Sequence, residues 1–217
     1  MYKLFRKLEQ GERIVVGGDP ADGGTNYCAA QSYSMRHRDF PFVFHARMEA
    51  TQFGHELYKM ALYIKLATGE FPLIAPEKNT GGSTIYVLMQ YNYPNLFRMP
   101  KSLLDPTAKD KEQGEIGFIT THTVRMMIID ELAVSLRQKA VKIYDLDTVK
   151  ELMTFVVKAS GKPEAANGCF DDLVMSAAIA IKAAQVSPRT KSLSKEEMAA
   201  KMAAFPAIQR NDDGVPV

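Results

Sequence analysis

One segment near the C-terminal end constrains the fold most strongly, because a helix formed by it would be apolar on nearly every side. Residues 170–185 have this character, and a helix that is hydrophobic all round must be covered by other elements. We therefore expect them to form a helix buried against a sheet layer. Its apolar members are Leu173, Val174, Met175, Ala177, Ala178, Ile179 and Ile181.

Three segments near the N-terminus have the pattern of consecutive strands. Residues 13–18 are apolar and lead into Gly-Gly-Asp-Pro, and an Asp-Gly-Gly turn signal precedes a second strand at about 26–34. In residues 42–48, apolar and polar side chains alternate, which is typical of a strand with one buried face. The three segments predict an antiparallel meander.

The rest of the sequence alternates between helical and extended patterns. Residues 53–64 have helical apolar spacing with Gly69 as a stop signal, residues 71–76 predict a fourth strand, and Gly81 leads into another helix. Further predictions are an exposed loop or small hairpin at 98–116, a helix capped by Thr121 or Thr123, and a helix at 147–158 capped by Asp147 with Val149, Leu152, Phe155 and Val156 inward.

This order of elements is that of a ribonuclease H-like core. We predict the α/β class and the RuvC/integrase-type variant of that fold, with a mixed five-stranded sheet flanked by helices. Residues 1–186 would form this domain, and residues 187–217 would form a flexible C-terminal tail.

Acidic residues stand at the ends of three of the predicted elements. Asp19 ends the first strand, Glu77 follows the fourth, and Asp171 and Asp172 open the last helix. In a ribonuclease H-like core these ends meet, so we expect the carboxylates to lie together. Hard Mg²⁺ and Mn²⁺ ions prefer carboxylate oxygens, and two such ions promote phosphodiester hydrolysis. The pattern predicts a two-metal nuclease.

Each acidic position also has an ordinary structural interpretation. Asp19 alone suits a turn, Glu77 a solvated strand end, and the Asp pair a helix N-terminus favoured by the helix dipole. Their placement on three particular elements favours the metal site. Adjacent helical residues point about 100° apart, so the sequence does not distinguish Asp171 from Asp172 as the ligand.

Composition excludes several other classes of protein. The apolar fraction is 46% and the charged fraction 24%, as in ordinary soluble domains, and no apolar run is long enough to cross a membrane. Cys28 and Cys169 give neither a disulfide framework nor a zinc cluster. The four histidines have no metal-ligand spacing, and His45 is interpreted as structural or exposed. A net charge of +2 does not by itself indicate nucleic-acid binding.

Six sequence blocks in order, over about residues 13–182, together resemble the nuclease domain of the large terminase subunit of tailed bacteriophages. They are Gly18-Asp19-Pro20-Ala21 with Gly23-Gly24, Glu77-Lys78-Asn79-Thr80-Gly81, Tyr93-Pro94-Asn95-Leu96, Gly117-Phe118 with Thr120 to Arg125, Glu151-Leu152 with Phe155, and Asp171 to Ser176.

The resemblance implies an endonuclease that cuts concatemeric double-stranded viral DNA during genome packaging, with little sequence specificity. Asp19, Glu77, Asp171 and Asp172 would be the catalytic residues and would hold two Mg²⁺ or Mn²⁺ ions. Asn26 stands where many relatives have an aspartate, so Asn26 and Asp22 are the accessory candidates. The DNA-binding candidates are Lys78, Arg98, Lys101, Lys109 and Arg125.

Large terminases also contain a packaging ATPase domain, and this sequence has no phosphate-binding loop of that kind. We therefore expect the chain to be the nuclease part of a longer protein. The implied partners are double-stranded DNA, the ATPase domain, the small terminase subunit and the portal. The implied location is the cytoplasm of the infected bacterial host, with no membrane contact.

Two kinds of alternative remain open. A Holliday-junction resolvase or transposase-type nuclease would share the fold and the metals but prefer branched DNA or specific ends. A non-catalytic packaging or interaction module would retain the acidic residues without cleaving DNA.

Overall fold

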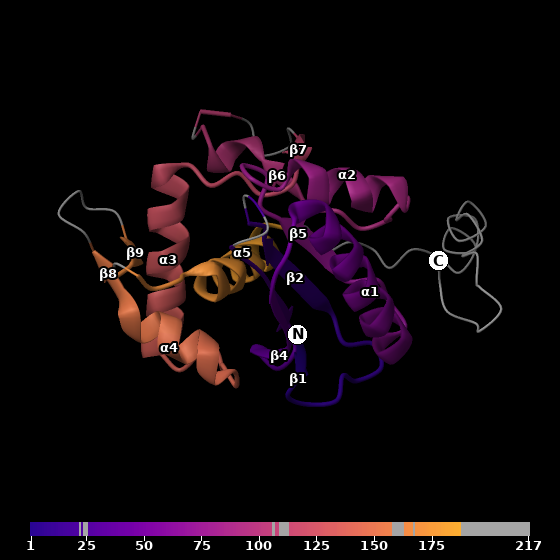
Figure 1. Ribbon diagram of the computed structural model, residues 1–217, viewed down its shortest axis with the longest axis horizontal. Coiled ribbons are helices and arrows are strands. Elements are labelled where there is room, and N and C mark those ends of the chain that lie inside the picture. Colours follow the sequence, from indigo (N-terminus) through magenta and orange to yellow (C-terminus); the bar gives the residue numbers. More distant parts are fainter. Residues whose placement is uncertain are drawn as a thin grey trace.

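The computed structural model describes residues 1–21, 23, 26–105, 107–108, 113–157, 163–166 and 168–187. A five-stranded sheet forms the centre, with helices on both faces (Figure 1). Its strands are β1 (Tyr2–Leu4), β2 (Ile14–Asp19), β3 (Tyr27–Ser34), β4 (Asp39–Arg47) and β5 (Leu73–Pro76), in the order β1-β4-β3-β2-β5. Only β2 and β5 pair in parallel within this sheet; the other pairs are antiparallel.

Five α-helices and two small hairpins complete the described part of the chain. The helices are α1 (Ala50–Thr68), α2 (Gly82–Gln90), α3 (His122–Arg137), α4 (Leu146–Thr154) and α5 (Asp172–Val186). One hairpin pairs β6 (Arg98–Pro100) with β7 (Gln113–Ile116), with the short 3-10 helix η1 (Lys101–Leu103) after β6; the other pairs β8 (Phe155–Val157) with β9 (Pro163–Ala165). No described helix has the length and apolar character needed to span a membrane.

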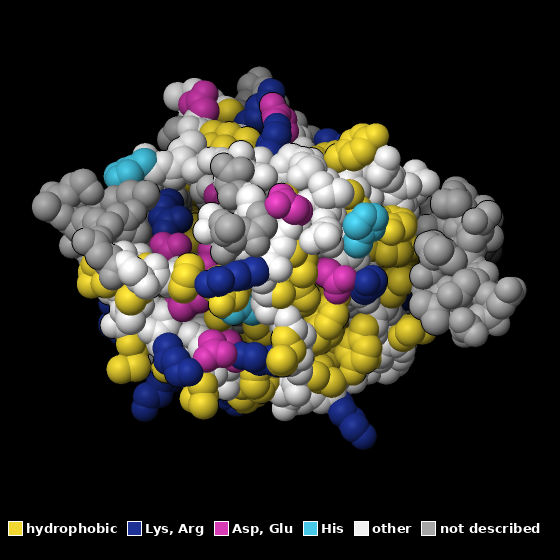
Figure 2. All heavy atoms as spheres, in the orientation of Figure 1, with side chains coloured by type: hydrophobic (Ala, Val, Ile, Leu, Met, Phe, Trp, Pro, Cys, Tyr) yellow, Lys and Arg dark blue, Asp and Glu magenta, His cyan; other side chains and the backbone are white. Residues whose placement is uncertain are grey.

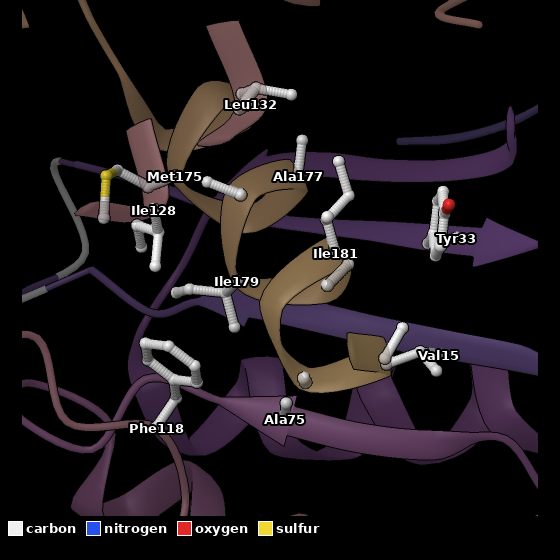
Figure 3. Packing of buried hydrophobic residues seen from close by; sticks show 14 of the residues in the cluster. Val15, Tyr33, Ala75, Phe118, Ile128, Leu132, Met175, Ala177, Ile179 and Ile181 are labelled. Carbon is white, nitrogen blue, oxygen red and sulfur yellow. The ribbon is translucent and has the colours of Figure 1, made fainter. Parts of the chain in front are cut away.

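The alternation along β2 separates two hydrophobic cores. Ile14 and Val16 pack with α1 on one face of the sheet, whereas Val15 packs with α5 on the other. Figure 3 shows α5 between the sheet and α3, with Ile179 and Ile181 of α5 packed among the apolar side chains of this core. The last helix is therefore buried on all sides, as its sequence predicts.

A glycine sets the distance between α5 and the sheet. Gly17 lies in β2 beneath the helix, and a Cβ atom there would overlap the carbonyl oxygen of Ser176 and the amide nitrogen of Ala180. Only glycine allows this close approach of helix and strand backbones.

The predicted fold class is confirmed, as is the antiparallel meander of β2, β3 and β4. The fifth strand is β1, which the sequence pattern does not indicate. The small hairpin at 98–116 and the cap at Thr121 are also confirmed, since the Thr121 side chain accepts a hydrogen bond from the Val124 amide. Most of the predicted tail, residues 188–217, lies outside the described residues.

The prediction for α4 was wrong in three respects. The helix predicted at 147–158 ends at Thr154, and Phe155–Val157 form strand β8 instead. Its cap is Asp145, whose side chain accepts from the Thr148 amide, and Asp147 lies in the first turn. Val149 and Val156 are exposed rather than buried. The polar side chains of Thr148 and Glu151 are buried instead, because both take part in hydrogen bonds with neighbouring elements.

Candidate metal centre

The parallel pairing of β2 with β5 places Asp19 beside Glu77. Gly18 lies opposite Pro76 in the register, and the Glu77 amide donates to the Gly18 carbonyl at 2.7 Å. Both strands end at the same edge of the sheet, so the acidic residue at each end faces the same region. The two carboxyl groups are close enough to share a hydrogen bond.

The start of α5 completes this edge. Gln31 of β3 donates to the Leu173 carbonyl at 2.8 Å, and Leu173 packs on Ala29 and Val43 of the sheet. This contact brings Asp171 and Asp172 close to Asp19. Burial and the negative charges of Glu77, Asp172 and Asp171 raise the pKa of Asp19 well above its ordinary value. The structure thus brings all four predicted carboxylates together.

Two threonine hydroxyls hold Glu77, which is buried. Thr120 Oγ1 donates to Glu77 Oε1, and Thr80 Oγ1 donates to Glu77 Oε2 at 3.2 Å. Burial raises the pKa of Glu77, and hydrogen bonds from Thr80 and Asp19 and the charge of Arg125 oppose that rise. The carboxylate is therefore fixed in orientation before any ligand binds.

The two adjacent aspartates have different surroundings. Asp171 forms an ion pair with Arg125 at 2.5 Å and accepts from the Ala165 amide at 3.2 Å. Asp172 Oδ2 is buried and has no hydrogen-bond partner among the described residues. Burial, followed by the charge of Asp171, raises the pKa of Asp172 to about 6. Asp172 is thus the member of the pair that retains an unsatisfied ligand atom.

Two residues that the sequence pattern did not assign to the site lie beside Asp172. Ligand atoms of His45, Glu151 and Asp172 all lie within 4.8 Å of one another, and His45 Nε2 is also buried without a partner among the described residues. The alternation of β4 places His45 on one face, but only the strand register reveals that Asp19, Ala29 and His45 form one row. Glu151 was part of a recognised sequence block, and its position in α4 gave no sign of a ligand role.

These residues fit a divalent cation. The donor set consists of carboxylate oxygens, which are ordinary ligands of Mg²⁺ and Mn²⁺, and one imidazole nitrogen, which is an ordinary ligand of Zn²⁺. A buried carboxylate oxygen without a donor is costly, and a bound cation would satisfy it. In the absence of a cation, the raised pKa values show that the site opposes accumulation of negative charge.

Three of the predicted DNA-binding residues, Lys78, Arg98 and Arg125, belong to segments next to this edge. The Lys78 amide donates to Phe118, and Gly117 is bridged to Arg98, so the β6–β7 hairpin lies next to the end of β5. Lys78 forms an ion pair with Glu115, and Lys101 is exposed in η1. Figure 2 shows basic and acidic side chains interspersed on the face that it presents.

Three predicted positions have little or no described role. Asp22 and Lys109 lie outside the described residues. Asn26 is exposed just before β3, and its backbone N–H donates to the Gly23 carbonyl at 3.2 Å. The accessory assignments of Asp22 and Asn26 therefore stay predictions.

Comparison with known proteins finds similarity at the level of structure. No protein-family model matches the chain, and no curated protein matches it. The large terminase nuclease from thermophilic phage G20c has a TM-score of 0.62 at 15% identity, covering 83% of this chain and 87% of that chain. The same nuclease with bound magnesium gives a TM-score of 0.61 at 14% identity, covering 83% and 86%.

A longer protein also matches. This large terminase, from another thermophilic bacteriophage, has a TM-score of 0.54 at 13% identity, covering 82% of this chain and 41% of that chain. These similarities confirm that the chain has the ribonuclease H-like fold found in terminase nucleases.

Proposed function

We propose that this chain is a metal-dependent endonuclease of the terminase type, which cleaves concatemeric double-stranded viral DNA during genome packaging. The observation that carries the proposal is the convergence of Asp19, Glu77, Asp171 and Asp172 from the ends of three elements. The fold of the terminase nucleases supports it, since one of these has been seen with bound magnesium.

In this proposal the four carboxylates hold two Mg²⁺ or Mn²⁺ ions. When bound, these ions activate water and stabilise the negative charge on the leaving oxygen of the phosphodiester. Thr120 and Thr80 orient Glu77, while Arg125 holds Asp171 through their ion pair. Without metal, burial and the neighbouring carboxylates raise the pKa of Asp19, so the site disfavours its ionised form.

DNA binding in this proposal relies on contacts to phosphate. Lys78, Arg98, Lys101, Lys109 and Arg125 would supply positive charge around the acidic centre. Contacts of this type carry little sequence information and weaken strongly as salt rises. We therefore propose weak sequence preference for the cleavage.

The biological setting is also part of the proposal. The similarity to 41% of a longer large terminase supports a role as the nuclease part of a protein that also has a packaging ATPase domain. The small terminase subunit and the portal would be further partners, and the cytoplasm of the infected bacterial host would be the site of action.

The test is cleavage of supercoiled plasmid with Mg²⁺, Mn²⁺, Ca²⁺ or EDTA, comparing the wild type with Glu77→Gln. We expect nicking and linearisation with Mg²⁺ or Mn²⁺ only, and at least a ~100-fold loss in the variant, equivalent to roughly 3 kcal/mol of transition-state stabilisation. The matched control is Glu70→Gln, an exposed glutamate before the other end of β5, which should cleave normally.

Each alternative outcome has a clear meaning. Cleavage that survives EDTA or Glu77→Gln would place the activity elsewhere. Faster cleavage of a four-way junction than of linear duplex would favour a resolvase, and no cleavage under any condition would favour a non-catalytic packaging module.

A further inference from the structure

His45, Glu151 and Asp172 come from three different elements and meet at one point. They lie on β4, α4 and α5, and their ligand atoms are all within 4.8 Å of one another. His45 Nε2 and Asp172 Oδ2 are both buried and have no hydrogen-bond partner within the described ranges. Buried polar atoms of this kind are uncommon and costly, and two in one cluster indicate a missing ligand.

The strand register separates this cluster from the Asp19–Glu77 pair. Asp19 on β2 lies opposite Ala29 on β3, and Ala29 lies opposite His45 on β4. Asp19 and His45 are therefore separated by two strand spacings. Neighbouring strands lie about 4.8 Å apart, which puts the backbones of Asp19 and His45 about 10 Å apart. Asp172 is the residue common to both groups, since its charge also raises the pKa of Asp19.

The cluster is held in place by contacts of its own. The Leu173 and Val174 amides donate to Glu151 Oε2 at 2.8 and 3.2 Å, so the start of α5 fixes this carboxylate. The His45 ring lies against the Tyr27 ring, with centroids 4.4 Å apart. Ligands that are oriented by neighbours in this way are typical of metal sites.

We propose that His45, Glu151 and Asp172 bind a divalent transition-metal ion of the Zn²⁺, Mn²⁺ or Co²⁺ class, beside the carboxylate centre. One imidazole nitrogen with two carboxylates suits these ions, whereas Mg²⁺ prefers oxygen ligands and retains its water. The ion joins β4, α4 and the start of α5. Its binding does not depend on DNA cleavage, so the inference goes beyond the proposed function.

The test is titration of the metal-free protein with Co²⁺ in excess Mg²⁺. Binding is measured from the visible absorption of the bound Co²⁺ and from the change in melting temperature. His45→Gln should weaken Co²⁺ binding at least about 10-fold and abolish its stabilising effect. Glu77→Gln, which alters only the carboxylate centre, should leave the Co²⁺ signal in place. His55→Ala is the matched control, because His55 is an exposed histidine on α1 whose Nδ1 contacts the Tyr91 hydroxyl.

Glu151→Gln is the second variant, since an amide oxygen can still accept from Leu173 and Val174, and circular dichroism checks that each variant folds. Crystals soaked in Co²⁺ should show an anomalous peak between the three residues. An unchanged Co²⁺ signal in both His45→Gln and Glu151→Gln, full displacement of Co²⁺ by Mg²⁺, or a peak elsewhere would overturn the site. Loss of cleavage in Glu77→Gln with Co²⁺ binding retained would separate this site from the nuclease centre.

Discussion

Two acidic clusters lie at opposite ends of the same strand, β2, and they differ in whether a positive side chain of the protein balances them. Near its start, Glu12 and Asp39 are 1% and 2% exposed, and Arg6 bonds to both, at 2.5 Å to Glu12 and 2.7 Å to Asp39. Near its end, Asp19 and Glu77 lie with Asp172, whose Oδ2 has no donor in the described part of the chain. In the first cluster the guanidinium of Arg6 balances the two carboxylates. The second cluster has too little positive charge to balance its carboxylates.

The pKa values express this difference. Burial of Glu12 opposes its ionisation, yet the hydrogen bonds and charge of Arg6 lower its pKa to about 2. Burial raises the pKa of Asp172 to about 6 and that of Glu151 to about 8, with nearby carboxylates adding to both. Burial alone therefore does not distinguish a structural carboxylate from a candidate ligand; the presence of a cation among the protein's own side chains does.

The largest expected effect on stability comes from removing Arg6 from its cluster with Glu12 and Asp39. Arg6→Met leaves two buried carboxylates uncompensated and should lower the free energy of unfolding by about 3–5 kcal/mol. Arg125→Met, at the partly exposed pair with Asp171, should cost about 1 kcal/mol or less. Urea denaturation measures both, and equal losses would contradict the contrast between the two clusters.

Acid should act on the two clusters in opposite directions. The folded pKa of Glu12 is below its unfolded value, so its contribution is complete above pH ~4.5 and is lost as pH falls toward about 2, on the order of 3 kcal/mol. The folded pKa of Asp172 is above its unfolded value, so ionising it destabilises the metal-free protein as pH rises from about 4 through about 6.

The melting temperature of metal-free protein should therefore be highest near pH ~4–5. Glu12→Gln should remove the loss on the acid side, and Asp172→Asn should reduce the loss on the neutral side. A melting temperature that rises steadily from about pH 4 to about pH 8 would show that the carboxylates near Asp19 are not destabilising.

Asp172→Asn should stabilise the metal-free protein at about pH 7.5, because it removes a negative charge that the site opposes. The expected gain is on the order of 1–3 kcal/mol in the free energy of unfolding. The rise in melting temperature that Mg²⁺ or Mn²⁺ gives the wild type should shrink in the same variant. Calorimetry with and without metal tests both, and a less stable metal-free variant would be the contrary result.

The smallest expected effect concerns the orientation of Glu77. Thr120→Val removes the hydroxyl that donates to Glu77 Oε1, at a cost of about 0.5–1.5 kcal/mol in stability. We expect cleavage to need a higher Mg²⁺ concentration while its rate at saturation changes less. Thr107→Val, on an exposed turn, is the control, and an equal metal requirement in both variants would exclude a positioning role for Thr120.

Much of the fold and the convergence of four carboxylates were predictable from the sequence. Asp19, Glu77 and the Asp171–Asp172 pair lie at the ends of three elements, and the order of these elements implies that the ends meet. The burial of α5 is evident from its apolar composition. These inferences need only local patterns and chain order. Their roles as metal ligands stay predictions.

His45, Glu151 and the orientation of α4 were not predictable in this way. Sequence patterns assume that apolar side chains point inward, but α4 exposes Leu146 and Met153, at 71% and 81%, and buries Thr148 and Glu151. Gln31 donates to Thr148 and the start of α5 donates to Glu151, so long-range hydrogen bonds decide which face is inward. Such bonds depend on strand register, which no local pattern shows.

Gly17 has a consequence for how the protein tolerates change. Because backbone meets backbone at this glycine, the separation of β2 and α5 cannot adjust by a change of side-chain rotamer. The carboxylate at the end of β2 and those at the start of α5 are therefore held by a stiff spacer, and the candidate centre inherits that stiffness. A bound cation would therefore be accommodated by rotation of the carboxylate side chains rather than by movement of α5 against β2.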